Sequence, residues 1–179
     1  HSVFPNPPEI THGFGKLKNG LINNLTANRI IAVAGAAKDN LIEAGVSKRK
    51  ITVVPNGVDA IRKYSDAEME MARTFYNLSP NNFVFAMIAR IEDIKGHTYF
   101  LQAAEKIKDK FTNARFYICG TGGFAENVKN EIKMRNLSDC VMYLGHVQDV
   151  TSVMNIIDVN VNCSYGTEAT SLSLLEGMS

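Results

Sequence analysis

Two cations follow a strongly apolar run at residues 83–89. Arg90 and Lys95 come after that run, and Gly96 follows the second cation. Fixed positive charge beside a glycine, whose backbone lets a ligand approach closely, is the chemistry of a phosphate site. A lone Arg and Lys at this spacing are also common on solvated surfaces. The pair therefore indicates a phosphate site only if other segments converge on it.

Three more apolar runs end in segments suited to the same chemistry. Small or polar residues follow residues 115–119, 141–144 and 157–162, and they read Gly120-Thr121-Gly122-Gly123, Gly145-His146-Val147 and Ser164-Tyr165-Gly166-Thr167-Glu168. Exposed backbone N–H groups and the positive end of a helix dipole both favour anions. Each glycine cluster by itself is more often a turn, so its place in the fold decides between the two readings.

The elements that must position these segments alternate along the chain. Apolar strand patterns at residues 30–34, 51–54, 83–89, 115–119, 141–144 and 157–162 alternate with helical patterns at 98–111, 125–136 and 148–156. Such alternation predicts right-handed βαβ units and an α/β fold, a Rossmann-like parallel sheet with helices on both faces. Ligands of such a sheet bind beyond the carboxyl ends of its strands. All four segments then share one edge, which predicts an anion site there.

A polar segment divides the chain. Residues 66–77 read as a polar helix containing methionine, and the turn cluster at residues 78–82 precedes a new strand. We expect residues 1–58 to be the tail of a first Rossmann-like domain, 59–82 a linker with a helix, and 83–179 a second, truncated domain. The first residue is not Met, and the last helical pattern stops without a cap. Both observations indicate a fragment of a longer chain.

The composition is that of an ordinary globular protein. Of 179 residues, 45% are hydrophobic and 21% charged, with a net charge of +1, and no basic run contains interleaved aromatics. Nucleic acid and an anionic membrane are therefore not expected as the main partner. No apolar run approaches the ~18 residues of a membrane span, and the first residues do not resemble a signal peptide.

The three cysteines are widely spaced. Cys119, Cys140 and Cys163 show neither a C-x-x-C pair nor a zinc spacing. We expect buried, reduced thiols in a cytoplasmic protein.

Three motifs resemble the retaining glycosyltransferases of family 4, enzymes of the two-domain GT-B architecture. Residues 89–96 are similar to the R-x4-K-G signature of that family, and residues 168–178 match its E-x7-E motif. Residues 51–59 resemble the segment at which these enzymes pass between domains. The motifs occur in the family's order and span most of the chain. The resemblance implies a GT-B donor-binding domain preceded by the tail of the acceptor-side domain.

The resemblance also implies a role for each matching residue. Arg90 and Lys95 would hold the donor diphosphate and stabilise the leaving nucleoside diphosphate. Glu168 would lie against the donor sugar, and Glu176 would bind the ribose hydroxyls. Further donor contacts would come from a close approach at one glycine, from a backbone contact to the nucleobase and from amides at the start of the last helix: Gly122, Val147, Ala169, Thr170, Ser171 and Leu172.

Two positions depart from the family or stand alone. Thr170 and Ser171 occupy places where the family often has an aromatic residue and Gly or Pro, which leaves the sugar undetermined. His12 resembles a histidine that lies near the donor in the first domain and would join the catalytic group. A lone histidine is also commonly structural, so both roles stay open for it.

The implied reaction moves a sugar from a nucleoside diphosphate, UDP first among the candidates, to a carbohydrate or lipid-linked acceptor in polysaccharide synthesis. The family retains the anomeric configuration and needs no essential metal, and the only adjacent acidic pair after the apolar runs, Glu92-Asp93, is not a D-x-D motif. The residues leave a carboxylate nucleophile and same-face attack both open. Many relatives work at the membrane surface through the first domain, which leaves peripheral association at the cytoplasmic face open.

Three alternatives compete with this assignment. Residues 120–125 fit the G-x-G-x-x-A pattern of a dinucleotide-dependent oxidoreductase. That fingerprint belongs on the first strand of its unit, with an acid ending the second strand, and here Gly145 follows the next strand. Another GT-B enzyme, such as a nucleotide-sugar epimerase or a phosphorylase, is a closer rival. The last is a nucleotide-sugar-binding fold without activity, and we expect the fragment alone to be inactive.

Overall fold

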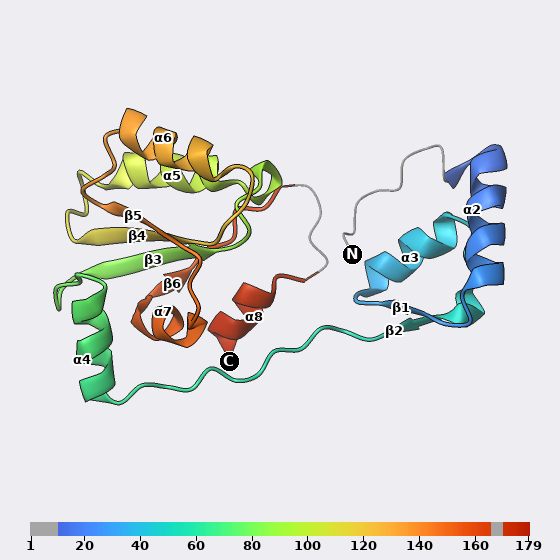
Figure 1. Cartoon of the computed structure of the whole chain (residues 1–179), viewed down its shortest axis with the longest axis horizontal. Helices are drawn as coiled ribbons and strands as arrows, with labels where there is room; N and C mark the ends of the chain where they lie inside the picture. Colours follow the sequence, from blue (N-terminus) through green and yellow to red (C-terminus); the bar gives the residue numbers. More distant parts are fainter. Residues whose placement is uncertain (1–10, 166–169) are drawn as a thin grey trace. The chain divides into compact units, whose positions relative to one another are not determined.

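The computed structural model describes residues 11–165 and 170–179, which form two compact units (Figure 1). The first unit ends at Val58 and also includes the described residues 170–172. The second unit comprises Asp59–Tyr165 and Ser173–Ser179. The chain therefore passes from one compact unit to the other at the segment that resembles an interdomain connection. The acceptor-side and donor-side roles of the two units stay predictions.

The first unit is a parallel strand pair with two helices. Its elements are α2 (Gly13–Thr26), β1 (Ile30–Ala32), α3 (Gly35–Glu43), the 3-10 turn η1 (Lys48–Lys50) and β2 (Ile51–Val53). β1 and β2 pair in parallel, with Ile30 opposite Ile51. The buried apolar core of this unit is small: Ala32, Val46 and Ile51. Neither helix was expected from the sequence. α2 buries only Gly20, whereas Ala37, Leu41 and Ile42 of α3 pack against this core.

Close backbone packing holds α2 in place. A Cβ on Gly20 would lie 2.5 Å from the Gly45 carbonyl oxygen, so only glycine fits there. The Asn24 side chain accepts from the Ser47 N–H at 2.9 Å and donates to the Gly45 carbonyl at 3.2 Å. The helix is thus anchored by polar contacts to the turn after α3.

The second unit is built on a parallel sheet with the strand order β5-β4-β3-β6 in the described residues. The strands are β3 (Phe83–Ile88), β4 (Ala114–Cys119), β5 (Val141–Gly145) and β6 (Val159–Asn160). The helices are α4 (Asp66–Phe75), α5 (His97–Ile107), α6 (Ala125–Met134), α7 (Val150–Ile156) and α8 (Leu172–Met178), with a 3-10 turn η2 (Asp93–Lys95) before α5. All pairings are parallel, as the alternation of strands and helices predicted.

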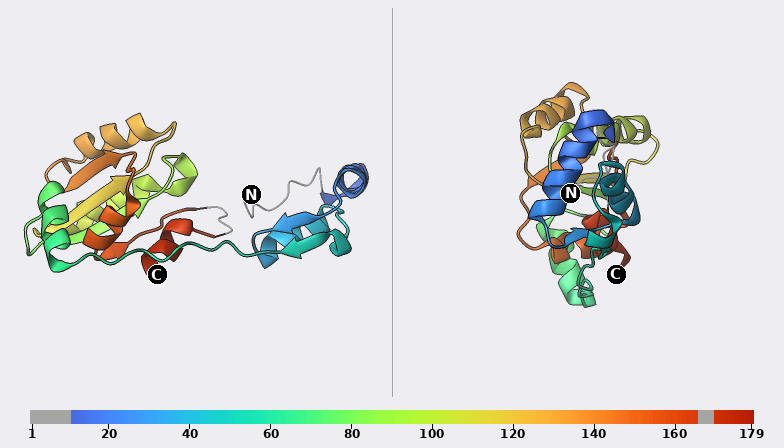
Figure 2. Two further views of the ribbon diagram at one scale, coloured as in Figure 1. Left: turned by 60° about the horizontal axis from the view of Figure 1, so that its bottom comes forward. Right: turned by 90° about the vertical axis from the view of Figure 1, so that its right-hand side faces the viewer.

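Helices cover both faces of this sheet (Figures 1 and 2). Alternate residues of β4 point to opposite sides: Phe116 and Ile118 pack with α5 and α6, whereas Tyr117 and Cys119 pack with α4 and α7. This period of two is the geometry of a strand buried on both faces. The predicted Rossmann-like layering is therefore confirmed.

The predicted elements of the second unit are all present, with shifted ends. β6 is shorter than the predicted strand at residues 157–162. Asp158 explains part of the difference, because its side-chain Oδ2 accepts from the Val84 N–H at 2.7 Å in place of a backbone ladder bond. The expectation of buried thiols holds for Cys119 but is wrong for Cys140 and Cys163, which are half-buried. All three thiols are unpaired.

Candidate functional site

The loops after β3 and β4 are joined by backbone hydrogen bonds at the carboxyl edge of the sheet. The Ala89 N–H donates to the Cys119 carbonyl at 3.0 Å, and the Ile91 N–H donates to the Thr121 carbonyl at 2.9 Å. The Phe124 N–H donates back to the Ile91 carbonyl at 3.0 Å. The segment that carries Arg90 is thus held against the glycine-rich segment, as the parallel order predicted.

Two glycines make this approach sterically feasible. A Cβ on Gly120, whose φ is +141°, would lie 1.9 Å from the Ala89 carbonyl oxygen. A Cβ on Gly122 would lie 2.2 Å from the Ile91 carbonyl oxygen. Real side chains do not approach a backbone oxygen so closely, so both positions exclude a Cβ. Gly122, predicted to let a donor approach, is required here by the neighbouring loop.

The loop after β5 joins the same edge. The Gly120 N–H donates to the Gly145 carbonyl at 2.7 Å, and the Tyr143 hydroxyl donates to the Gly120 carbonyl at 3.0 Å. Val147 follows in this loop and lines a pocket of about 460 Å³ with Phe75, Tyr76, Leu144, His146, Gln148, Asp149 and Ser152. The predicted nucleobase contact of Val147 stays a prediction, and its loop lies at the expected edge.

The segment that follows β6, residues 161–165, meets the turn after Lys95. Gly96 adopts a left-handed conformation with φ +75°, and a Cβ there would lie 2.1 Å from the Cys163 carbonyl oxygen. The Tyr165 N–H donates to the Ile94 carbonyl at 3.0 Å. The described parts of all four predicted segments are therefore gathered along one edge of the sheet.

The two predicted diphosphate ligands differ in their surroundings. Arg90 is exposed, and its side chain has no hydrogen-bond or ion-pair partner among residues 11–165 and 170–179. Lys95 is half-buried at the end of η2. An exposed guanidinium without a protein partner retains all of its N–H donors for an anionic ligand.

A buried imidazole lies directly behind this turn. His97, the first residue of α5, is 1% exposed, and neither ring nitrogen has a partner within the described part of the chain. Burial lowers the pKa of His97, the Glu92 backbone acts in the opposite direction, and the neighbouring Lys95 charge lowers it further. The ring is therefore neutral near pH 7, and the positive charge of the turn belongs to Arg90 and Lys95.

The E-x7-E residues are only partly described. Glu168 and Ala169 lie outside the described residues. Thr170 and Ser171 are half-buried, and Leu172 begins α8, which carries the half-buried Glu176. The Asn160 amide donates to the Ser173 carbonyl at 2.6 Å, which fixes α8 to β6. The predicted helix is present, and the donor contacts of these residues stay predictions.

His12 lies in the first unit, where it precedes α2. Its Nδ1 is 2.8 Å from the Thr11 hydroxyl oxygen. The structure shows this local contact with Thr11, and the position of His12 near the donor stays a prediction.

Within the described residues, no three His, Cys, Asp or Glu side chains are grouped closely enough to hold a metal ion. In the same part of the chain, no helix combines the length and the apolar character that a membrane crossing needs.

One pair at the site was missed in the sequence. The Tyr165 hydroxyl donates to Asp93 Oδ2 at 2.6 Å, although 72 positions separate the two residues. No periodicity or spacing signals such a contact. The sequence identifies Asp93 only as half of an acidic pair, and Tyr165 only as one polar residue in a loop.

Comparisons with known proteins agree along the whole chain. A family model described as glycosyl transferases group 1 matches residues 69–179, and a model described as glycosyltransferase family 4 matches residues 1–62. The Escherichia coli UDP-Gal:alpha-D-GlcNAc-diphosphoundecaprenol alpha-1,3-galactosyltransferase is 31% identical over 157 residues, which are 84% of this chain and 40% of that enzyme.

Solved structures show the same fold. Anabaena HepE, in complex with UDP and glucose, superposes with a TM-score of 0.82 at 21% identity, over 99% of this chain and 49% of HepE. TarM of S. aureus superposes with a TM-score of 0.74 at 21% identity, over 99% of this chain and 34% of TarM. The predicted fold class is confirmed, and the chain spans about half or less of the length of these relatives.

Proposed function

This chain belongs to the glycosyl transferases group 1 family, and we propose that it forms the nucleotide-sugar side of an enzyme that transfers a hexose. The observation that carries the proposal is the convergence of four loops beside Arg90, whose side chain has no partner among the described residues, at the carboxyl edge of the sheet. Arg90 and Lys95 hold the donor diphosphate in this proposal. Their charge stabilises the nucleoside diphosphate as it leaves.

We propose UDP as the nucleotide of the donor. HepE, which has this fold, is solved with UDP and glucose, and the E. coli relative is named as a UDP-Gal-dependent galactosyltransferase. Val147 contacts the base through its backbone and Glu176 binds the ribose in this proposal. No essential metal takes part, because Arg90 and Lys95 supply the positive charge that a divalent ion would otherwise bring.

The acceptor proposed for the whole protein is a carbohydrate or a lipid-linked sugar. The E. coli relative is named for a diphosphoundecaprenol-linked acceptor. Transfer proceeds with retention of the anomeric configuration, with Glu168 against the donor sugar and His12 nearby. This part of the proposal rests on the family resemblance of the motifs. NMR of the linkage formed by the full-length protein tests it, and an inverted product contradicts retention.

Isothermal titration with UDP, GDP and ADP, each with and without Mg²⁺, tests the donor site. We expect one nucleoside diphosphate, UDP, to bind without metal, and Arg90→Ala/Lys95→Ala to lose most of this affinity. A charge-assisted contact to phosphate contributes roughly 1.5–3 kcal/mol, so the double variant should bind at least about 100-fold more weakly.

The matched control is Lys106→Ala/Lys110→Ala. It removes the same two charges from exposed positions in and just after α5. Equal weakening in both double variants would reduce the effect to net charge and contradict the proposed site. Strictly Mg²⁺-dependent binding would contradict the metal-free part.

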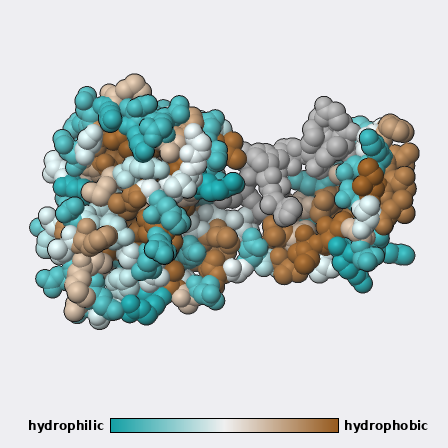
Figure 3. Space-filling model, viewed as in Figure 1, coloured by the Kyte–Doolittle hydropathy of each residue, from teal (hydrophilic) through white to brown (hydrophobic). Residues whose placement is uncertain are grey.

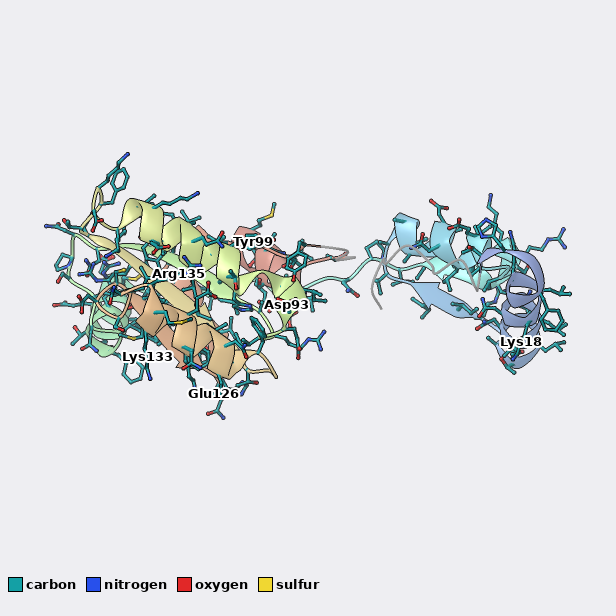
Figure 4. All side chains as sticks on the ribbon, turned by 90° about the horizontal axis from the view of Figure 1, so that it is seen from above. Lys18, Asp93, Tyr99, Glu126, Lys133 and Arg135 are labelled. Atoms are coloured by element: carbon teal, nitrogen blue, oxygen red, sulfur yellow. The ribbon has the colours of Figure 1, made fainter. Side chains whose placement is uncertain are left out.

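We further propose peripheral membrane association through the first unit. α2 exposes Phe14 (80%), Leu17 (67%), Leu21 (57%) and Leu25 (76%), and hydrophobic residues gather over this unit in Figure 3. The same helix carries Lys16 and Lys18 and no acidic residue (Lys18 is labelled in Figure 4). Lys18 lies beside this apolar face, and Lys16 lies on the opposite side of the helix. An apolar face with an adjacent lysine suits an anionic membrane surface.

Sedimentation with anionic and neutral vesicles tests this association. We expect binding to anionic vesicles that weakens in high salt and in Leu21→Gln/Leu25→Gln. Equal partition of wild type and variant would contradict it. The unpaired cysteines support a cytoplasmic location for the same proposal.

A further inference from the structure

Tyr165 joins the segment after β6 to the turn between Arg90 and Lys95. Its backbone N–H donates to the Ile94 carbonyl at 3.0 Å, and its hydroxyl donates to Asp93 Oδ2 at 2.6 Å. Its ring meets the Tyr99 ring edge-to-face, with the ring centroids 5.6 Å apart. One residue thus contacts the turn η2 and the first turn of α5 through its backbone, its hydroxyl and its ring.

Asp93 occupies a sensitive place in this turn. It lies between the two cations that hold the donor diphosphate in the proposed function, and Figure 4 shows it at the same end of α5 as Tyr99. If the Asp93 carboxylate turned toward the phosphates, it would repel them. If it paired with Arg90 or Lys95, that cation would be less able to bind phosphate. A short hydrogen bond from Tyr165 instead fixes the carboxylate toward the segment after β6.

The backbone supports the same junction. Gly96 and Cys163 pack so closely that a Cβ on Gly96 would lie 2.1 Å from the Cys163 carbonyl oxygen. Lys95 immediately precedes Gly96, and Tyr165 comes two residues after Cys163. Movement of either loop at this junction therefore displaces a predicted phosphate ligand.

We propose that Asp93 and Tyr165 are positioning residues for the donor diphosphate. Their hydrogen bond holds η2 against the segment after β6 and so sets the geometry of Arg90 and Lys95. The same contact anchors the chain three residues before Glu168, the residue predicted to face the donor sugar. This inference rests on the proposed function, because it assigns the pair to the same donor site.

The protonation state of the pair is suited to this role. The hydrogen bond to Asp93, with smaller contributions from desolvation and from the Asp93 charge, raises the pKa of Tyr165 to about 12. The hydroxyl therefore remains a donor at any pH used for a binding assay.

A double-mutant cycle on UDP affinity tests the pair, with Tyr165→Phe, Asp93→Ala and the double variant. We expect each single variant to bind UDP about 3- to 10-fold more weakly, since a single hydrogen bond is lost. The double variant should be no weaker than the singles, because both remove the same interaction. Loss of UDP affinity in Asp93→Ala would support a positioning role, because removal of a negative charge should by itself strengthen UDP binding.

Asp93→Asn separates positioning from charge. Its amide oxygen still accepts from the Tyr165 hydroxyl while the charge is absent, as it is in Asp93→Ala. We expect Asp93→Asn to restore UDP affinity at least to the wild-type value. Tyr99→Phe is the matched control for removal of a phenol hydroxyl, because it keeps the aromatic edge, and it should bind UDP like wild type.

The outcomes distinguish this inference from the proposed function. If Arg90→Ala/Lys95→Ala loses UDP while Tyr165→Phe and both Asp93 variants bind as wild type does, the positioning role is wrong and the donor site stands. A lower temperature of thermal unfolding in these variants, without any change in UDP affinity, would also overturn the positioning role. That result would show that the hydrogen bond is purely structural. If the wild-type chain binds none of UDP, GDP and ADP, the donor site fails and the positioning role fails with it.

Discussion

Gly122 shows how a single residue depends on its neighbours in the fold. A Cβ there would meet not one atom but the Ile91 carbonyl oxygen, carbonyl carbon and nitrogen, at 2.2, 2.7 and 2.9 Å. Backbone cannot move aside as the end of a flexible side chain can. The glycine therefore fixes the distance between the loop after β3, which carries Arg90, and the glycine-rich loop after β4.

We predict that Gly122→Ala destabilises the second unit by about 1–3 kcal/mol, the usual cost of overpacking. The variant should also weaken UDP binding, because the Arg90 loop must shift. Urea unfolding and titration measure the two effects. Gly123→Ala is the control, since a Cβ at Gly123 meets nothing within 4 Å. Equal stability of the two variants would contradict this account.

Burial controls the reactivity of the thiols. Burial raises the pKa of Cys119 to about 12, and it also raises the pKa values of Cys140 and Cys163. The thiolate is the reactive form, so a raised pKa slows alkylation. We predict that iodoacetamide at pH 8 leaves Cys119 unmodified in the native protein and alkylates the half-buried Cys140 and Cys163 slowly. Peptide mass spectrometry identifies the modified sites, and early labelling of Cys119 would contradict its burial.

At the scale of elements, α4 has a complete capping box. The Ser65 hydroxyl accepts from the Glu68 N–H, and the Glu68 carboxylate accepts from the Ser65 N–H at 2.8 Å. Arg62 also pairs with Glu68 at 2.9 Å. The cap begins a helix whose Met69 and Ala72 pack on the sheet. Ser65 therefore stabilises the second unit as well as its own helix.

We predict that Ser65→Ala lowers the free energy of unfolding by about 1 kcal/mol, as for other lost N-caps. Urea unfolding measures it. Ser138→Ala, at an exposed position outside a helix, is the control and should change little. An unchanged midpoint in Ser65→Ala would show that the packing of α4 alone fixes its start.

The same cap should respond to acid. Hydrogen bonds from Arg62 first, and from Ser65, lower the pKa of Glu68 from 4.5 to about 2. A lowered pKa in the folded state means that the stabilisation is present above about pH 4.5 and is lost as the pH falls toward 2. We predict a smaller loss of thermal stability between pH 6 and pH 3 in Glu68→Gln than in wild type. Identical pH profiles would contradict the pairing.

At the scale of the whole molecule, the two units differ in how much apolar surface they bury. The second unit has two clusters of buried residues, one on each face of its sheet. The first has a core of three fully buried apolar residues beside exposed apolar positions on α2. Since apolar burial dominates stability, the second unit should open less readily.

We predict slower amide hydrogen exchange in β3 and β4 than in β1 and β2, by at least about tenfold. Peptide-resolved mass spectrometry of the native chain measures it. Within the second unit, the edge strand β6 serves as an internal reference of intermediate protection. Equal protection of β1 and β3 would show that the first unit is stabilised by contacts other than its own core.

The sequence alone determined the fold class, the strands of the second unit and the identity of the four loops. Those features follow from local pattern, since buried parallel strands must be apolar runs and parallel order places every loop that follows a strand at the same edge. The same patterns placed α4, α5, α6 and α7 to within a few residues. They were not used to identify α2 and α3, although Phe14, Leu17, Leu21 and Leu25 recur at helical spacing in α2.

Only the tertiary structure decided how the loops touch. The contact of Asp93 with Tyr165, the fit of Gly96 against Cys163 and the packing of Gly122 on Ile91 join residues far apart in the chain. Such pairs depend on the order β5-β4-β3-β6 and on backbone distances of a few ångströms, which no spacing in one sequence encodes. Residue types therefore indicated a phosphate site, and the packing of strands and loops determined which residues position it.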